Sequence, residues 1–418
     1  MGTLTLCKSK RKSEVDAKTH TSQALVLLRT AAVVLLALFV LAVLPTALPA
    51  QSAAVRIGEI DPLTGKLAKH GTEIHEGIVA AVEEINQRGG ILGRPVELAF
   101  RDDQSLPETA INQAEDLLYR ENVLGLVGGY VDSLVAPVSE LAAKHRIPYV
   151  ASASLQRSLT QGRHNPYFFR VAHLDGIVRP LCGFVTNVLK ARSIAILHSA
   201  TPGSTEFAEE IRACLEAAHL PVTLFEKFRP GSHDFSAFLM KARQAAVDTL
   251  ICGGFLPDHL MLVRQLKDQR IPVRHYIGPW GVAYGSFIEE MGRDSEGLLG
   301  MCAWNPGITR PGTDEQSQAF VERFRARFKK SPNSTTMHGY VSARALLAAI
   351  ESVATTSTPL TGEAIAAKLR TVDIATPMER LAFDEQGDPK DYHQVIVQIQ
   401  NGKMVAIYPP ERATGKLE

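Results

Sequence analysis

The sequence predicts an α/β protein built from two consecutive arrays of parallel strands and helices. Short β-rich apolar runs alternate with amphipathic stretches from Val55 onward, a βαβ rhythm typical of parallel sheets. The same rhythm restarts near residue 178 after a first complete array. The chain has 418 residues, of which 45% are hydrophobic, so two domains with sizeable cores can form.

The first array is predicted between residues 55 and 155. Its opening helix is the clearest, because isoleucine or valine recurs at helical spacing from Ile74 to Ile85. Gly89-Gly90 ends that helix, since glycine adopts the left-handed conformation of a helix terminus. We expect strands at residues 55–60, 96–102, 123–129 and 147–152, and helices at 72–88, 108–121 and 133–145.

The second array and the C-terminal part follow the same logic. Continuous apolar strands are expected here, as in parallel sheets that are buried on both faces. Asn401-Gly402 is a strong hairpin-turn signal between two final strands. Strands are expected at residues 193–199, 221–228, 248–255, 274–280, 298–304, 394–400 and 403–408, and helices at 178–190, 205–219, 235–245, 260–269, 315–329, 338–353 and 361–369.

The N-terminus has the order of a secretory signal peptide. A basic segment precedes an apolar run from Thr30 to Leu44, and small residues follow Pro45. Cleavage is expected after Ala50 or Ala54, which would place the mature protein in the periplasm. An uncleaved membrane anchor remains the alternative, because the apolar run is long.

Four cysteines lie beyond this segment. Cys252 and Cys302 fall in apolar, strand-like runs, which favours buried free thiols. The spacing contains no CxxC pair, so neither a zinc site nor a redox motif is indicated. Export permits disulfides, but the sequence leaves open whether Cys182 and Cys214 form one.

Charge and motifs argue against several functional classes. Lys plus Arg total 45 and Asp plus Glu total 44, so the chain lacks the basic field that nucleic acids require. No phosphate-binding loop, HExxH motif or nucleophile elbow occurs, and the histidines show no metal-ligand spacing. We therefore predict a binding protein that is not an enzyme and that has no cofactor or metal.

A ligand site is expected at one edge of the sheets. In open α/β sheets, ligands bind beyond the C-terminal ends of the strands. Helices begin there with free N–H groups and a positive dipole end, which suit carboxylate or carbonyl oxygens. The rule selects residues 67–71, 129–133, 151–155, 255–258 and 279–282, with 199–205 as a sixth candidate.

Several segments resemble the leucine/isoleucine/valine-binding family of periplasmic receptors. The resemblance covers residues 55–408 and implies a type I periplasmic binding fold, in which two Rossmann-like lobes are joined by a three-crossover hinge. The matching segments are DPLTGKLAKHGTEIHEGIVAAVEEINQRGGILGRPVEL, RDDQSLPETA, GLVGGYVDSLVAPVSELAAKHRIPYVASAS, YFFRVAHLD, HDFSAFLMKAR and HGYVSARALLAAI.

The resemblance also implies a division of the chain and a role for it. The N-terminal signal and tail are expected over residues 1–54. The first lobe is expected over 55–171 and 304–380, and the second over 172–303 and 381–418. The implied role is the extracytoplasmic solute receptor of an ABC importer, with a membrane permease and an ATPase as partners. A sensory or regulatory module that binds amides is the alternative, since the same fold serves both.

Ser133 matches the serine that holds the ligand carboxylate in amino-acid-binding members of the family. The same residue can also cap the following helix. The second carboxylate-binding hydroxyl of the family falls on Leu155, where Ser154 is adjacent and can substitute. The backbone at Ala153 and Ser154 can contribute as well.

The acid that pairs with the ligand ammonium in the family falls on Trp280. A family tyrosine falls on Gly203 and an aromatic residue of the first loop falls on His70, while Phe255 lies where the family offers aromatic contacts. The predicted ligand-contacting residues are thus His70, Tyr130, Ser133, Ala153, Ser154, Phe255 and Trp280.

The tryptophan in the acid's place bears on selectivity. A buried ammonium needs a counter-charge, which Trp280 cannot supply and for which Asp132 and Asp258 are the candidates. Both acids are otherwise explained as surface or capping residues. Tyr130, Phe255 and Trp280 instead indicate an apolar or amide-like solute that contacts aromatic faces. Ordinary packing between the lobes is the competing explanation for Trp280.

Overall fold

The computed structural model describes residues 53–162 and 165–418. The predicted signal peptide or anchor lies outside these residues, so its cleavage and its role stay predictions. In the part of the chain that is described, no helix is both long enough and apolar enough to cross a membrane. Residues 54–418 form one unit that contains two large sheets and the helices around them.

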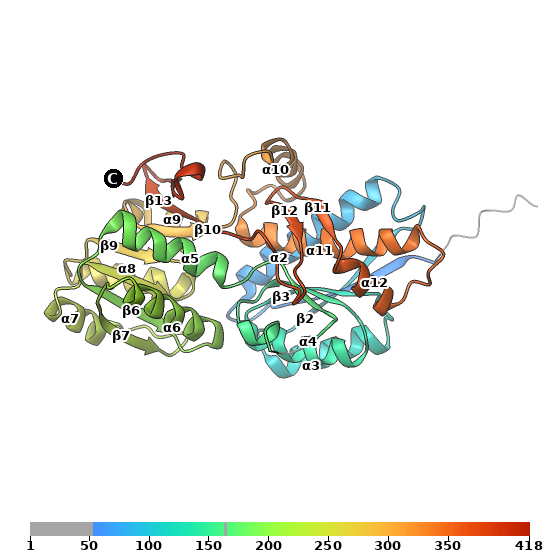
Figure 1. The fold of residues 1–418 in the computed structure, drawn as a ribbon, viewed down its shortest axis with the longest axis horizontal. Coiled ribbons are helices and arrows are strands. Elements are labelled where there is room, and N and C mark those ends of the chain that lie inside the picture. The colour runs from blue at the N-terminus through green and yellow to red at the C-terminus, as the bar shows by residue number, and fades with distance from the viewer. Residues whose placement is uncertain (1–52, 163–164) are drawn as a thin grey trace, which may run out of the picture. The chain divides into compact units, whose positions relative to one another are not determined.

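The first large sheet is entirely parallel, as the first array predicts (Figure 1). Buried side chains of α2 and α11 pack on one of its faces, and those of α3 and α4 pack on the other. Its strands, in spatial order, are β2 (Val96–Asp102), β1 (Val55–Asp61), β3 (Leu126–Tyr130), β4 (Tyr149–Ala153) and β5 (Phe168–Arg170). Its helices are α2 (Ala68–Gln87), α3 (Pro107–Tyr119), α4 (Asp132–Lys144), α11 (Ser334–Ala354) and α12 (Gly362–Leu369).

Helices α2 and α11 approach each other unusually closely. A Cβ atom on Gly77 would lie 2.0 Å from the carbonyl oxygen of Thr336, and one on Gly339 would lie 2.2 Å from that of Ile74. Such distances are far inside van der Waals contact, so glycine is required at both positions. The close contact ties a helix of the first array to one from the C-terminal part, and α11 thereby joins the first sheet.

The second sheet has seven strands: the predicted parallel strands are joined by an antiparallel hairpin, whose turn the sequence predicted but whose place in the sheet it did not. Five strands are parallel, but β13 and β14 form the expected hairpin and add to β10 in antiparallel orientation. Its strands, in order, are β14 (Lys403–Tyr408), β13 (Val395–Gln400), β10 (Leu299–Cys302), β9 (His275–Gly278), β8 (Thr249–Gly253), β6 (Ile194–Ser199) and β7 (Val222–Phe228).

Helices again cover both faces of the second sheet. Residues of α5 and α6 pack on one face, and residues of α7, α8 and α9 pack on the other. The helices are α5 (Asp175–Phe184), α6 (Pro202–Ala217), α7 (Ser236–Gln244), α8 (Leu256–Asp268) and α9 (Gly285–Met291).

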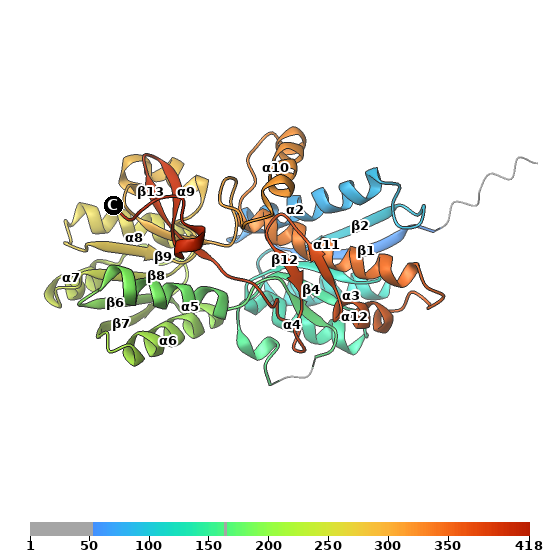
Figure 2. The same ribbon diagram turned by 45° about the horizontal axis from the view of Figure 1, so that its top comes forward.

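The chain passes between the two sheets three times, which Figure 2 shows from a second direction. It leaves the first sheet after β5 and leaves the second after β10. Helix α10 (Asp314–Phe328) then leads to α11, and a small sheet of β11 (Asp373–Ala375) and β12 (Arg380–Ala382) precedes the return to β13. The predicted α/β fold with two lobes and three crossovers is confirmed.

Some element boundaries differ from those predicted. Helix α11 begins at Ser334 rather than at residue 338, because the Asn333 side chain caps it by accepting a hydrogen bond from the Thr336 N–H at 3.0 Å. The helix expected over 178–190 changes into a π-helical turn at Val185–Leu189. Elements β5, α9, β11 and β12 were not expected, since each is too short to show a periodic pattern.

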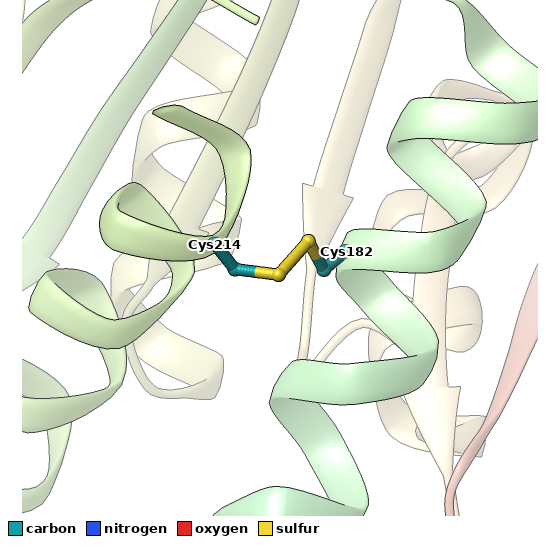
Figure 3. Close-up of a disulfide and its surroundings, with 2 residues drawn as sticks. All are labelled: Cys182 and Cys214. Carbon is teal, nitrogen blue, oxygen red and sulfur yellow. A yellow bond between two sulfur atoms is a disulfide. The ribbon is translucent and has the colours of Figure 1, made fainter. Parts of the chain in front are cut away.

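Cys182 and Cys214 form a disulfide between α5 and α6 (Figure 3), which resolves the question left open by the sequence. Their Cα atoms are 6.3 Å apart. Cys252 and Cys302 are buried free thiols, as predicted. The disulfide fixes the two helices on one face of the second sheet, near the C-terminal end of α6.

Removal of this disulfide should destabilise the protein by about 3–4 kcal/mol, because the bridge closes a segment of 32 residues and limits the unfolded chain. The change to test is Cys182→Ser combined with Cys214→Ser, measured by urea unfolding. Dithiothreitol should lower the urea unfolding midpoint of the wild type to that of the variant. It should leave the midpoint of the variant unchanged. Equal unfolding midpoints without reductant would contradict a structural role.

Candidate ligand-binding site

A cavity lies where the C-terminal strand ends of both sheets meet residues of α11 and of the segment before β13. The space open to the centre of a water molecule amounts to ≈ 90 Å³, which corresponds to roughly six to nine water-sized positions. The cavity is therefore on the scale of a small solute. Its walls combine aromatic rings, small hydroxyl side chains and the beginnings of helices.

The structure brings five of the seven predicted residues together at this cavity. Tyr130, Ser133 and Ala153 line it from the first sheet, and Phe255 and Trp280 line it from the second. Residues of the sixth candidate loop, 199–205, line it as well, whereas none of residues 67–71 does. Whether these side chains contact a solute stays a prediction.

His70 and Ser154 do not line the cavity. His70 is buried behind the wall, where its ring packs 4.8 Å from the Tyr130 ring and 5.4 Å from the Tyr284 ring, measured between centroids. Ser154 is buried too, and its carbonyl faces the Arg170 guanidinium at 3.4 Å. His70 is thus placed to hold two aromatic rings of the wall in position.

The start of α4 has an unusual backbone. Val131, which precedes the helix, has a φ of 65°, a conformation that a β-branched residue rarely adopts and that costs on the order of 1–3 kcal/mol. Its N–H donates to the carbonyl of Ala153 at 3.0 Å, which holds it there. Strain of this kind is concentrated at functional sites.

Ser133 does not cap α4. The capping position is Val131, and the helix begins at Asp132, so Ser133 is its second residue. The side chain of Ser133 is exposed and lines the cavity. The first N–H groups of a helix have no partner within it, and the Ser133 hydroxyl lies beside them. Helix capping, the alternative explanation for Ser133 beside ligand contact, therefore does not apply.

Asp132 is the one acidic residue that lines the cavity among the residues described. Its Oδ1 accepts hydrogen bonds from the N–H groups of Leu155 and Gln156, each at 2.8 Å. Its Oδ2 lies against Gly203, where a Cβ atom would approach to 2.2 Å. Burial raises the pKa of Asp132, and the two backbone hydrogen bonds oppose that rise. The carboxylate thus ties the start of α4 to Leu155 and Gln156, and its Oδ2 packs closely against the start of α6.

Asp258, the other acid considered as a partner for an ammonium, caps a helix. Its Oδ2 accepts from the N–H of Phe255 at 2.9 Å, immediately before α8. It does not line the cavity.

The wall from the second sheet is mainly aromatic. Phe255, Trp280 and Tyr284 line it, and the Trp280 ring meets the edge of Phe207 at a centroid distance of 5.0 Å. The indole N–H of Trp280 has no hydrogen-bond partner among the described residues. Trp280 therefore both packs within the second sheet's core and borders the cavity.

A further wall comes from elements that the strand-end rule does not select. Thr335 and His338 on α11 line the cavity, together with Tyr392 and Gln394 of the segment before β13. Gln394 donates from Nε2 to the Tyr392 hydroxyl at 2.7 Å, and Thr335 donates to the Tyr284 hydroxyl at 3.2 Å. Asn333, a favoured N-cap residue, was a sequence signal for the early start of α11 and thus for Thr335 and His338.

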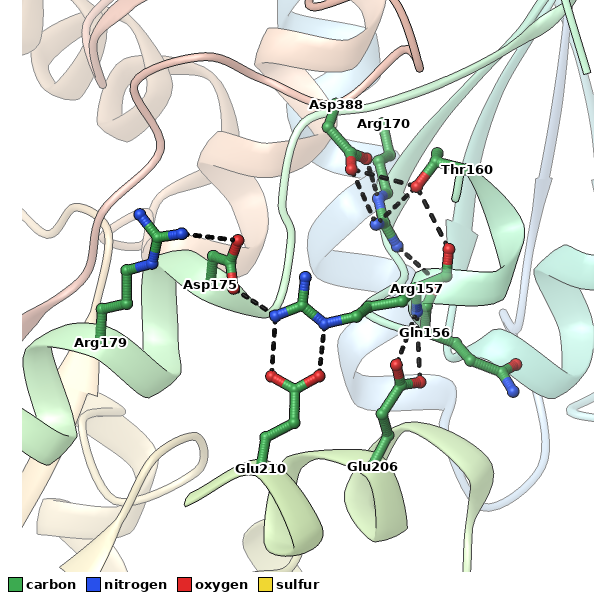
Figure 4. A network of polar contacts seen from close by, with 9 residues as sticks. All are labelled: Gln156, Arg157, Thr160, Arg170, Asp175, Arg179, Glu206, Glu210 and Asp388. Atoms are coloured by element: carbon green, nitrogen blue, oxygen red, sulfur yellow. Dashed lines mark hydrogen bonds and ion pairs between the residues drawn. The ribbon is translucent and has the colours of Figure 1, made fainter. Parts of the chain in front are cut away.

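Ion pairs flank the cavity along the segment that follows Leu155 (Figure 4). The Arg157 side chain pairs with both carboxylate oxygens of Glu210 and with Asp175, and its backbone N–H donates to Glu206 at 3.1 Å. Glu206 and Glu210 belong to α6, and Asp175 begins α5. One arginine of the loop after β4 is thus bound to two helices of the second sheet.

Comparisons with known proteins agree with this geometry. A family model described as periplasmic binding protein matches residues 54–403. The leucine-, isoleucine-, valine-, threonine- and alanine-binding protein of Pseudomonas aeruginosa is 27% identical over 342 residues, which cover 81% of this chain and 88% of that protein.

Two other relatives have similar coverage. The Leu/Ile/Val-binding protein homolog 1 of Brucella suis is 28% identical over 84% of this chain and 91% of its own length. The crystal structure of a leucine-binding protein, LivK, from Thermotoga maritima has a TM-score of 0.75 and 25% identity, covering 85% of this chain and 98% of that one.

The resemblance found in the sequence is thus confirmed over most of the chain. Since the family model extends over residues 54–403, which include the first sheet, all three crossovers and the second sheet up to the start of β14, the chain belongs to the periplasmic binding protein family.

Proposed function

We propose that this protein is the extracytoplasmic solute receptor of an ABC importer, which captures a small carboxylate or amide with an apolar body. The family is one of solute-binding receptors rather than enzymes, and relatives of similar length are named for the amino acids that they bind. In this role the partners are a membrane permease and an ATPase, and the protein works in the periplasm.

The composition of the cavity is the observation that carries the proposed solute class. The first sheet offers the start of α4 with Ser133, and the second sheet offers the start of α6 with Thr201 and Ser204. Helix N-termini and hydroxyls of this kind favour a carboxylate or a carbonyl oxygen. The second-sheet side offers Phe255 and Trp280, which favour an apolar body.

Free amino acids fit this cavity less well than they fit a receptor with an acid for the ammonium group. The family's acid falls on Trp280, and Asp132 is already bound to two backbone N–H groups and packed on Gly203. No Lys, Arg or Glu lines the cavity among the described residues. An ammonium group would therefore be buried without a full counter-charge, which costs several kcal/mol.

The first test is calorimetric titration with leucine, isoleucine and valine. The wild type should bind all three at least about a hundredfold more weakly than a receptor that has the ion pair. Trp280→Glu should strengthen leucine binding by about tenfold or more, because it returns a carboxylate to this wall, whereas Trp280→Gln should not. A wild-type Kd below about 1 μM for any of the three would show that Asp132 pairs with the ammonium.

The second test concerns the carboxylate end. Ser133→Ala should weaken binding of any solute that raises the melting temperature by about tenfold or more, the cost of losing a hydrogen bond to a charged group. Stability without solute should hardly change, since Ser133 is exposed and does not cap α4. Ser139→Ala is the matched control, because Ser139 lies on the same helix, its hydroxyl donates to the Ala136 carbonyl and it does not line the cavity. Equal effects of the two changes on affinity would show that Ser133 is an ordinary surface residue without a role in binding.

The third test concerns export. Mass spectrometry of the periplasmic fraction should find a mature chain that begins near Gln51 or Val55, because small residues follow the apolar run. A full-length chain held in the membrane fraction would support the anchor instead. A full-length chain found solely in the cytoplasm would contradict the proposed location.

A further inference from the structure

One wall of the cavity is formed by α11 and the segment before β13. Two buried polar atoms in this wall have no hydrogen-bond partner among the described residues. They are Nε2 of His338 and Oε1 of Gln394. His338 is 8% exposed and Gln394 is 7% exposed, yet both side chains line the cavity. A buried polar group without a partner costs about 1–3 kcal/mol, so such a pair in one cavity wall needs an explanation.

The surrounding contacts keep both side chains in place. The Gln394 amide is bonded at Nε2 to the Tyr392 hydroxyl, and its backbone N–H donates to the Gly176 carbonyl at 2.8 Å. The Tyr392 ring also packs against the His338 ring, with the centroids 5.8 Å apart. Tyr392 is fully buried and a Cβ atom on Gly176 would lie 2.3 Å from its carbonyl oxygen. The two unpartnered atoms therefore belong to a rigid unit.

The chemistry of these two atoms limits which solute group could form hydrogen bonds with both of them. Burial lowers the pKa of His338 to about 4, so the imidazole is neutral and its Nε2 either donates or accepts. The Gln394 amide has both a donor end and an acceptor end, and Tyr392 engages one of them. A hydroxyl both donates and accepts, and it is uncharged. An ammonium group would find no carboxylate in this wall, where the lining residues are Ser334, Thr335, His338, Tyr392 and Gln394.

We propose that His338 and Gln394 form a polar subsite for a hydroxyl group carried by the apolar body of the solute. The proposal rests on the proposed function, in which the carboxylate of the same solute binds near Ser133. It narrows the solute to a hydroxylated apolar carboxylate. Selectivity follows because a solute without the hydroxyl buries both protein atoms and leaves them unpaired, which is costly.

The experiment compares two pairs of acids that differ by one hydroxyl, namely benzoate with 4-hydroxybenzoate and hexanoate with 6-hydroxyhexanoate. Affinities are measured by calorimetry on the mature protein. In at least one pair, the hydroxylated acid should bind about tenfold or more tightly than its parent. Gln394→Met, a change of similar shape, should bring the ratio of the two affinities within that pair close to one.

Gln398→Met is the matched control. Gln398 is a buried glutamine on β13, the strand that follows Gln394, and its side chain does not line the cavity. It should leave the preference for the hydroxylated acid unchanged. Melting temperatures without solute show that each variant is folded. His338→Phe provides an independent variant from α11 and should also reduce the preference.

The outcomes separate the subsite from the function on which it rests. Binding of a parent acid with no gain from the hydroxyl in either pair would overturn the subsite and leave the carboxylate receptor standing. A preference that survives in Gln394→Met would overturn the assignment of these residues. Failure of all four acids to bind at millimolar concentration would contradict the proposed solute class, and the subsite with it.

Discussion

A buried arginine is the constraint on which the arrangement around the cavity depends. Arg170 is 1% exposed, and a cation buried to this degree must be paired and fully hydrogen-bonded. Its guanidinium contacts Asp388 at 2.5 Å, the Thr160 hydroxyl at 2.9 Å and the Gln156 carbonyl at 2.8 Å (Figure 4). These partners come from the loop after β4 and from the third crossover, so one side chain joins segments that are up to 218 positions apart.

The same loop carries the contacts that reach the second sheet. Because Arg170 holds the Gln156 carbonyl, the next residue, Arg157, is positioned to pair with Glu210 of α6. Asp132 acts from the other side of this loop, since its carboxylate accepts from the Leu155 and Gln156 N–H groups. The starts of α4 and α6 are therefore held at one cavity by charged groups that are satisfied within the protein. Because these groups are satisfied within the protein, the cavity features that remain for a solute are hydroxyls, helix termini, aromatic rings and the subsite proposed for His338 and Gln394.

Aromatic packing makes the wall around a solute rigid. His70 supports the Tyr130 and Tyr284 rings, and Phe207 supports the Trp280 ring. Side chains that sit in a packed core lose little further freedom when a ligand binds, so less of the binding energy is spent on ordering them. We expect residues behind the wall to influence affinity through this packing. His70, which the family resemblance implies as a ligand contact, is one of these residues, since it packs on the wall but does not line the cavity.

The sequence by itself determined the order of most strands and helices, since their apolar periodicity is local and survives in any tertiary arrangement. It also located Tyr130, Ser133, Ala153, Phe255 and Trp280 at one edge, because the carboxyl ends of parallel strands lie together. Only the tertiary structure decided the pairing of Cys182 with Cys214, the antiparallel addition of β13 and β14, and the positions of His70 and Ser154 behind the wall. It also brought His338 and Gln394 to the cavity from α11 and the third crossover. Contacts of this kind join residues far apart in the chain, and no local pattern of side chains encodes which of them will meet.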